Sequence, residues 1–226
     1  TPRGPASGGR VASQVVSDST SRSRTSTVVG ILVGLVLLGL VAAFAIGLPK
    51  AAGDDATEAA ADVELSLPDT LPGGYAAADD AASFADGDLA QQAEAIAQQQ
   101  AASTKYGNQV LPDVLGTPAV TRSYVVDGTT AVFVQVFQSD GGAFAPGSLT
   151  DPETTNGAGG TTMEAVGDGA CILTYGQSTD GSAGTPSQSE CQVSQDGLTV
   201  QIQSSGVEAA ELVKVADGIL DDLSQQ

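Results

Sequence analysis

The longest apolar run in the chain covers residues 27–48, which read TVVGILVGLVLLGLVAAFAIGL and include no charged residue. A helix of these 22 residues is roughly 33 Å long, which is enough to cross a hydrocarbon core of about 30 Å. The pattern therefore predicts one transmembrane helix in the cytoplasmic membrane. Gly30 and Gly34 within it have a spacing that permits close helix contact and weak self-association of this helix, although glycine is common in membrane helices in any case.

Charges on the two sides of this run predict its orientation. Arg10, Arg22 and Arg24 precede it, whereas acidic residues follow from Asp54 onward. Because positively charged flanks stay in the cytoplasm, we expect the N-terminus inside and everything after residue 48 outside. A cleaved signal peptide is the alternative, since small residues at 43 and 45 suit signal peptidase. The apolar core of such a peptide is usually only about 7 to 15 residues long, however.

Composition divides the remaining chain into three parts. Residues 1–26 are rich in Ser, Thr, Gly and Arg, which predicts a disordered, basic cytoplasmic tail. Residues 49–66 are acidic, rich in Ala and without periodicity, which is typical of an extended stalk. Residues 67–226 contain the strand and helix patterns and are predicted to form one extracytoplasmic domain.

Two segments of this domain have helical patterns. Residues 89–106 consist of strong helix formers and are followed by Gly107, a residue that commonly terminates helices. Residues 207–223 have a wider apolar stripe, and Ser205 with Glu208 fits a capping box at its start. The stripe consists of Leu212, Val215, Ala216, Ile219, Leu220 and Leu223.

A first hairpin is predicted at Asp127-Gly128, a dipeptide typical of two-residue turns. With Val126 opposite Thr129, the valines of the second strand share one face and the aromatic residues share the other. Helices on one side of the sheet cannot cover both faces. The candidate surface for a protein partner is therefore Tyr124, Phe133, Phe137 and Arg122. The alternative is that residues 139–161 or 67–75 pack there as ordinary core.

A second hairpin is predicted at Asp196-Gly197, with an apolar and a polar face. Residues 170–176 form a further strand, and residues 162–166 another short one. If strand 170–176 pairs with the second hairpin, Cys171 lies beside Cys191. Two cysteines in an oxidising compartment predict a disulfide between Cys171 and Cys191.

Together these elements predict an α+β architecture. One transmembrane helix is followed by an antiparallel sheet of about five strands, with helices packed on one face. Residues 139–161 are too poor in apolar side chains to fold alone, and loops of that length are disordered or functional. Phe144 and Leu149, their only large apolar residues, would suit a docking loop.

The charge of the chain excludes several partners. Its net charge is −19, and residues from 49 onward contain four Lys/Arg against 26 Asp/Glu. Such a field repels nucleic acid and anionic lipid surfaces, so we expect no nucleic-acid partner.

Residue types required for much enzyme chemistry are missing. The chain contains no His, which excludes the usual serine triads and zinc proteases in these residues. It also lacks GxSxG, GxGxxG and Walker A motifs. Adjacent carboxylates such as Asp79-Asp80 are expected by chance in so acidic a chain, and none has EF-hand spacing. We therefore predict no catalytic residue, no metal site and no cofactor.

The layout of basic tail, single membrane helix and acidic exterior domain resembles that of many uncharacterised single-span membrane proteins of actinobacteria. The segments LPDTLPGGY, residues 67–75, and ELVKVADGIL, residues 211–220, belong to this resemblance. It implies an exported accessory role and assigns no catalytic residue.

These observations predict a non-enzymatic, membrane-anchored extracytoplasmic domain that binds another envelope protein or senses a ligand. Two alternatives stay open: a secreted soluble protein after signal cleavage, and a hydrolase that uses carboxylates. Two carboxylates converging in a cleft would favour the hydrolase.

Overall fold

The computed structural model describes residues 65–225 except 87, 152–154, 156–158 and 177–184. The predicted tail and transmembrane helix, and the stalk up to residue 64, lie outside the described residues. Within the part of the chain that the structure describes, no helix is both long and apolar enough to cross a membrane.

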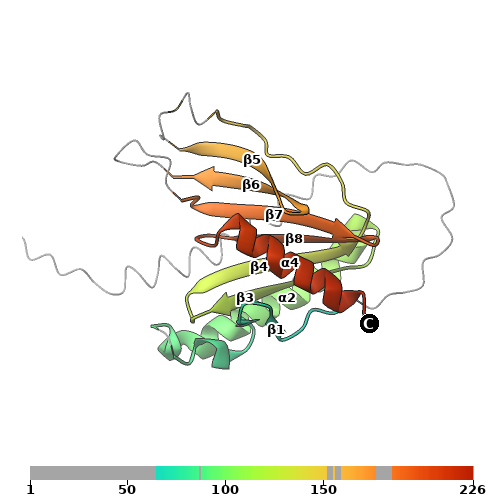
Figure 1. Ribbon diagram of the computed structural model, residues 1–226. Coiled ribbons are helices and arrows are strands. Elements are labelled where there is room, and N and C mark those ends of the chain that lie inside the picture. The colour runs from blue at the N-terminus through green and yellow to red at the C-terminus, as the bar shows by residue number, and fades with distance from the viewer. Residues whose placement is uncertain (1–64, 87, 152–154, 156–158, 177–184, 226) are drawn as a thin grey trace, which may run out of the picture.

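Eight strands of the described residues form one antiparallel sheet in the order β1-β2-β3-β4-β8-β7-β6-β5 (Figure 1). The strands are β1 (Thr70–Leu71), β2 (Tyr75–Ala77), β3 (Ala119–Val126), β4 (Thr130–Gln138), β5 (Gly160–Val166), β6 (Gly169–Tyr175), β7 (Gln188–Gln195) and β8 (Leu198–Ser204). Two short 3-10 helices, η1 (Ala81–Phe84) and η2 (Ala90–Gln92), precede α2 (Ala93–Leu115), and α4 (Ala209–Leu223) follows β8.

The prediction of about five strands with helices on one face is wrong. The sequence pattern indicated β3 to β8, but β1 and β2 contain two and three residues, too few for alternation to be recognised. The helices lie on opposite faces: α4 packs against β7 and β8, and α2 packs against β3 from the other side (Figure 1). The sheet therefore has an α4 face and an α2 face.

The main core lies between the sheet and α4. The predicted apolar stripe of α4 is confirmed, because all six of its residues are buried. They pack against the valines Val132, Val134 and Val136 of β4 and the apolar side chains of β7 and β8. The predicted capping box is wrong: the N-cap is Glu208, without a side-chain cap bond, and the helix begins at Ala209.

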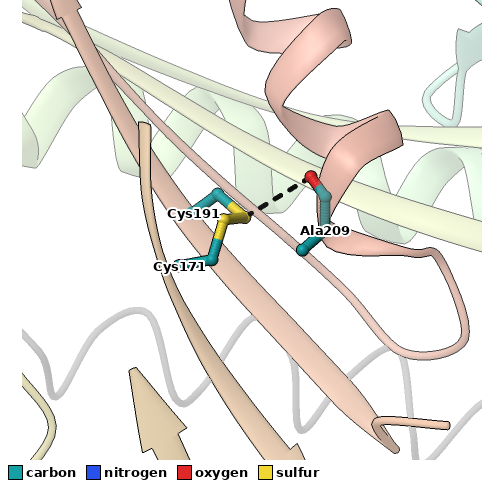
Figure 2. Close-up of a disulfide and its surroundings, with 3 residues drawn as sticks. All are labelled: Cys171, Cys191 and Ala209. Carbon is teal, nitrogen blue, oxygen red and sulfur yellow. Dashed lines mark hydrogen bonds between the residues drawn. A yellow bond between two sulfur atoms is a disulfide. The ribbon is translucent and has the colours of Figure 1, made fainter. Parts of the chain in front are cut away.

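The disulfide between Cys171 and Cys191 is confirmed, and it belongs to this core (Figure 2). The two residues are directly opposite each other on the neighbouring strands β6 and β7. Both are fully buried, and the sulfur of Cys191 lies 3.8 Å from the carbonyl oxygen of Ala209 at the start of α4. The bond therefore joins two strands directly beneath the helix.

A smaller core lies on the α2 face near the start of α2. It contains Ala78, Phe84, Leu89, Ala93, Ile96 and Val125. The predicted end of this helix at Gly107 is wrong, since α2 continues to Leu115 and ends at Gly116 in the left-handed conformation. Gly107 lies inside the helix against Thr121, where a β-carbon would collide with the Cγ2 atom of Thr121. Gly107 therefore permits close packing of α2 on the sheet and does not terminate the helix.

The first hairpin has the predicted turn but a different register. The Thr129 amide donates to the Val126 carbonyl, and Asp127 and Gly128 both have positive φ. Strand pairing nevertheless resumes one residue later, with Val126 opposite Thr130. A one-residue shift moves side chains to the other face of a strand pair. The second hairpin, with Gln195 opposite Leu198, has the predicted register and faces.

Candidate binding groove

The structure does not bring the four predicted surface residues together. Because of the register shift, Tyr124 is opposite Val132 and Arg122 is opposite Val134, which places both residues with the valines. Phe133 and Phe137 alternate with those valines and lie on the α2 face, where both are half-buried. The predicted aromatic strip is therefore split between the two faces.

Arg122 fastens the leading segment of the domain, residues 65–79, to the sheet. Its guanidinium donates to both carboxylate oxygens of Asp79 and to the carbonyl oxygens of Leu67 and Pro68. It also lies 2.9 Å from the carboxylate of Asp69. Burial lowers the pKa of Arg122, but the bonds to Asp79 and Asp69 outweigh it and raise the pKa overall. Arg122 is thus a structural clamp.

Tyr124 belongs to the same clamp. Its hydroxyl donates to the carbonyl oxygen of Pro68 over 2.9 Å, and its ring lies 5.9 Å below the Arg122 guanidinium carbon. Its side chain is completely buried. The leading segment thus lies over both Tyr124 and Arg122.

A groove lies on the α2 face, between the C-terminal end of α2 and the segment 139–150, and has a volume of about 760 Å³. Its lining residues come from all six strands from β3 to β5, from Ala119 on β3 to Thr161 on β5. Five inter-strand spacings of about 4.8 Å separate the first and last of these strands, so the groove is roughly 24 Å long. The volume is within the usual range of ligand sites, about 300 to 1,000 Å³.

The groove lining combines polar and apolar side chains. The polar side chains include the amides of Gln135 and Gln201 and the carboxylate of Glu190. The larger apolar side chains include Leu111 and Leu115 of α2, Phe137 of β4, Ile172 of β6, and Phe144 and Pro146 of the segment 139–150. Such a surface offers donors, acceptors and apolar contacts side by side.

Segment 139–150 forms one wall of the groove and is fixed at both ends. The Ser139 amide donates to the Gly197 carbonyl, and the Thr199 hydroxyl donates to the Ser139 carbonyl. At the other end, the Thr150 amide donates to the Thr161 carbonyl on β5. Phe144 and Pro146 are half-buried along the groove, whereas Leu149 is 65% exposed. Of the two apolar residues expected in a docking loop, Phe144 alone lines the groove.

Glu190 is the one acidic residue among the described residues that line the groove, and no Lys or Arg lines the groove beside it. Among the described residues, no hydrogen bond or ion pair to its carboxylate is formed. Burial raises the pKa of the Glu190 carboxyl above its ordinary value. The groove lining contains neither Lys nor Arg.

The described residues do not gather three or more His, Cys, Asp or Glu side chains in a metal-binding arrangement. A second, shallower depression lies beside Arg122 and contains Asp79, Asp80 and Glu94. Asp79 is already bound by Arg122 there.

The chain matches no family model, and no curated protein or solved structure is significantly similar to it. The resemblance to single-span actinobacterial membrane proteins therefore stays a prediction.

Sequence reasoning placed Phe137 on a candidate surface but missed Gln135, Gln201 and Glu190. The signal for Gln201 and Glu190 was present in the sequence. The second hairpin, which contains Gln201, alternates cleanly, and Glu190 shares the polar face of β7 with Gln192. The groove itself depends on the α2 position and on the path of segment 139–150. Neither follows from strand periodicity.

Proposed function

We propose that this chain is a membrane-anchored extracytoplasmic binding domain that holds an extended polypeptide segment of an envelope protein in the groove. The observation that carries the proposal is the groove itself, which crosses the sheet face where α2 and segment 139–150 leave the strands uncovered. The predicted membrane helix, residues 27–48, supports the anchoring and the location outside the membrane.

The dimensions of the groove suit an extended chain. A strand-like segment rises about 3.3 Å per residue, so roughly seven residues fit along 24 Å. Side-chain amides such as those of Gln135 and Gln201 both donate and accept, which matches the alternating N–H and C=O groups of a peptide backbone. Phe137 and Phe144 offer apolar contacts for the side chains of the bound segment.

The chemistry of the groove favours binding over hydrolysis. A carboxylate-based hydrolase requires two carboxylates that flank the reacting bond. Glu190 has no second acidic residue beside it among the lining residues. This arrangement supports a non-enzymatic role.

Selection from a library tests the proposal. A phage-displayed library of random peptides of about twelve residues, longer than the groove, is screened against the purified full chain in mild detergent. We expect enriched peptides that bind the wild type and bind Gln201→Arg at least about tenfold more weakly, equivalent to about 1.4 kcal/mol. The substitution fills the middle of the groove floor with a larger, charged side chain.

Gln99→Arg is the matched control, because Gln99 is exposed on α2 and does not line the groove. It should bind the enriched peptides like the wild type. Peptides that bind both variants equally well, or a library without any enrichment, would refute groove binding.

The anchoring part of the proposal has its own test. In the native host, we expect the chain to stay with the membrane fraction during a mild salt wash. Release of the domain by the wash would instead indicate a secreted protein after signal cleavage.

A further inference from the structure

Glu190 lies at a position in the groove where its charge is exposed to a bound ligand. It is directly opposite Ile172 on β6 and Gln203 on β8, and all three side chains lie on the α2 face. Ile172 is almost completely buried and lines the groove beside it. Glu190 thus has the apolar Ile172 as its neighbour on one side and the amide side chain of Gln203 as its neighbour on the other.

No Lys or Arg among the described residues compensates this carboxylate. The described residues contain three Lys/Arg, and each is placed elsewhere. Lys105 is exposed on α2, Lys214 is exposed on α4 across the sheet, and Arg122 is occupied by Asp79 and Asp69. None of the three lines the groove.

An acidic side chain without a partner in a half-buried position costs stability, because burial disfavours its charged form. The raised pKa of the Glu190 carboxyl reflects this cost. Glutamine at this position would fill the same space without the cost of burying a charge. The neighbouring Gln192 on the same face is such a residue. Destabilising residues of this kind concentrate at functional sites.

From this placement we infer that Glu190 selects a bound segment that has a lysine or arginine near its middle. The inference rests on the proposed function and adds the residue preference of the groove. The ammonium or guanidinium group pairs with the Glu190 carboxylate, and the alkyl stem of the same residue packs on Ile172. The strongly negative charge of the domain attracts such a basic segment from a distance.

Peptide pools with one fixed position test the inference. Heptapeptide pools, acetylated and amidated to remove terminal charges, have Lys, Arg, Gln or Glu at the central position and random residues elsewhere. Their binding to the purified full chain is measured by competition with a fluorescent peptide. We expect the Lys and Arg pools to bind about tenfold or more tightly than the Gln pool, and the Glu pool most weakly.

The variant Glu190→Gln should abolish the preference for basic residues while keeping the affinity for the Gln pool. Glu164→Gln is the matched control, since Glu164 is exposed on β5 and lies on the α4 face with Cys171. It should keep the wild-type preference. A thermal melt of each variant verifies that it is folded, and we expect Glu190→Gln to melt no lower than the wild type.

The outcomes separate the two claims. Pools that bind with no preference for Lys and Arg, or a preference that survives in Glu190→Gln, overturn the role of Glu190 and leave groove binding intact. If no pool binds, the proposed function fails and the inference fails with it.

Discussion

Arg122 is the one arginine among the residues that the structure describes, and it links two parts of the chain that are distant in sequence. Its guanidinium contacts carbonyl and carboxylate groups of residues 67–79, which precede α2 in the chain. Asp79, its main partner, is 17% exposed, so its charge would be poorly solvated without the arginine. The clamp therefore fixes the path by which the chain enters the domain.

Replacement of this clamp should destabilise the domain. Arg122→Leu leaves the Asp79 carboxylate without its partner, and we expect the free energy of unfolding in urea to fall by about 2 to 3 kcal/mol. Lys105→Leu, at an exposed position of α2, should change it by less than about 0.5 kcal/mol. Equal effects of the two substitutions would show that the clamp contributes little.

Tyr75 makes the stability of the fold decrease at alkaline pH. Burial, followed by the hydrogen bond to Glu211 and the charge of Glu211, raises the pKa of Tyr75 from 10.0 to about 12. The folded state thus favours the neutral phenol. The contribution of the neutral Tyr75 phenol to the free energy of unfolding is complete below pH 10 and is lost as the pH rises toward 12.

Unfolding free energies measured between pH 9 and 12 test this dependence. We expect a smaller alkaline decrease for Tyr75→Phe than for the wild type. Tyr106→Phe is the control, because Tyr106 is 69% exposed. An identical slope in wild type and Tyr75→Phe would contradict the assignment.

Gly107 sets the distance between α2 and β3. Asn108 beside it accepts a hydrogen bond from the Thr121 amide over 2.6 Å, so helix and strand cannot separate easily. Alanine is favoured over glycine in helices by about 1 kcal/mol. We nevertheless expect Gly107→Ala to lower the melting temperature, because its β-carbon collides with Thr121.

A second substitution identifies the cause. Thr121→Ser removes the Cγ2 atom and keeps the hydroxyl that donates to the Val134 carbonyl. The double variant should regain most of the lost stability, whereas Gly142→Ala, in open space, should behave like the wild type. A stable Gly107→Ala single variant would refute the steric explanation.

At the scale of elements, the disulfide joins β6 to β7 across residues 171–191. Closing a loop of this length stabilises a fold by roughly 3 kcal/mol on the chain-entropy model. We expect the double variant Cys171→Ala/Cys191→Ala to lose about that much stability in urea. Mass spectrometry of unreduced protein exported by its native host should detect the linked peptides, and free thiols there would contradict the bond.

Sequence patterns predicted most elements but not their relative placement. The helix stripe on α4 and the faces of β7 and β8 depend on neighbours within a few residues or on one turn, and the cysteine pair followed from pairing strand 170–176 with the second hairpin. The register of β3 and β4 did not follow from the same turn signal, because Asp127-Gly128 is followed by one extra residue, Thr129. That single residue moved Tyr124 from a predicted surface into the core.

At the scale of the whole molecule, the groove is a consequence of topology. α2 lies over β3, at one side of the sheet, and leaves the α2 face of β8, β7 and β6 without a helix. Segment 139–150 connects the end of β4 with the opposite edge of the sheet and forms a wall across this open face. Half-buried polar residues such as Gln201 and Glu190 tolerate this partial covering, which an apolar face would not.

Chemical-shift mapping tests the groove most directly. The full chain, labelled with ¹⁵N, is titrated with a peptide selected from the library, and the amide signals are followed. The predicted result is that the largest shifts occur in the side-chain amides of Gln135 and Gln201 and in the backbone of Glu190 and residues 143–148. Shifts confined to α4 or to the leading segment 65–79, with these signals unchanged, would contradict the assignment of the groove as the binding site.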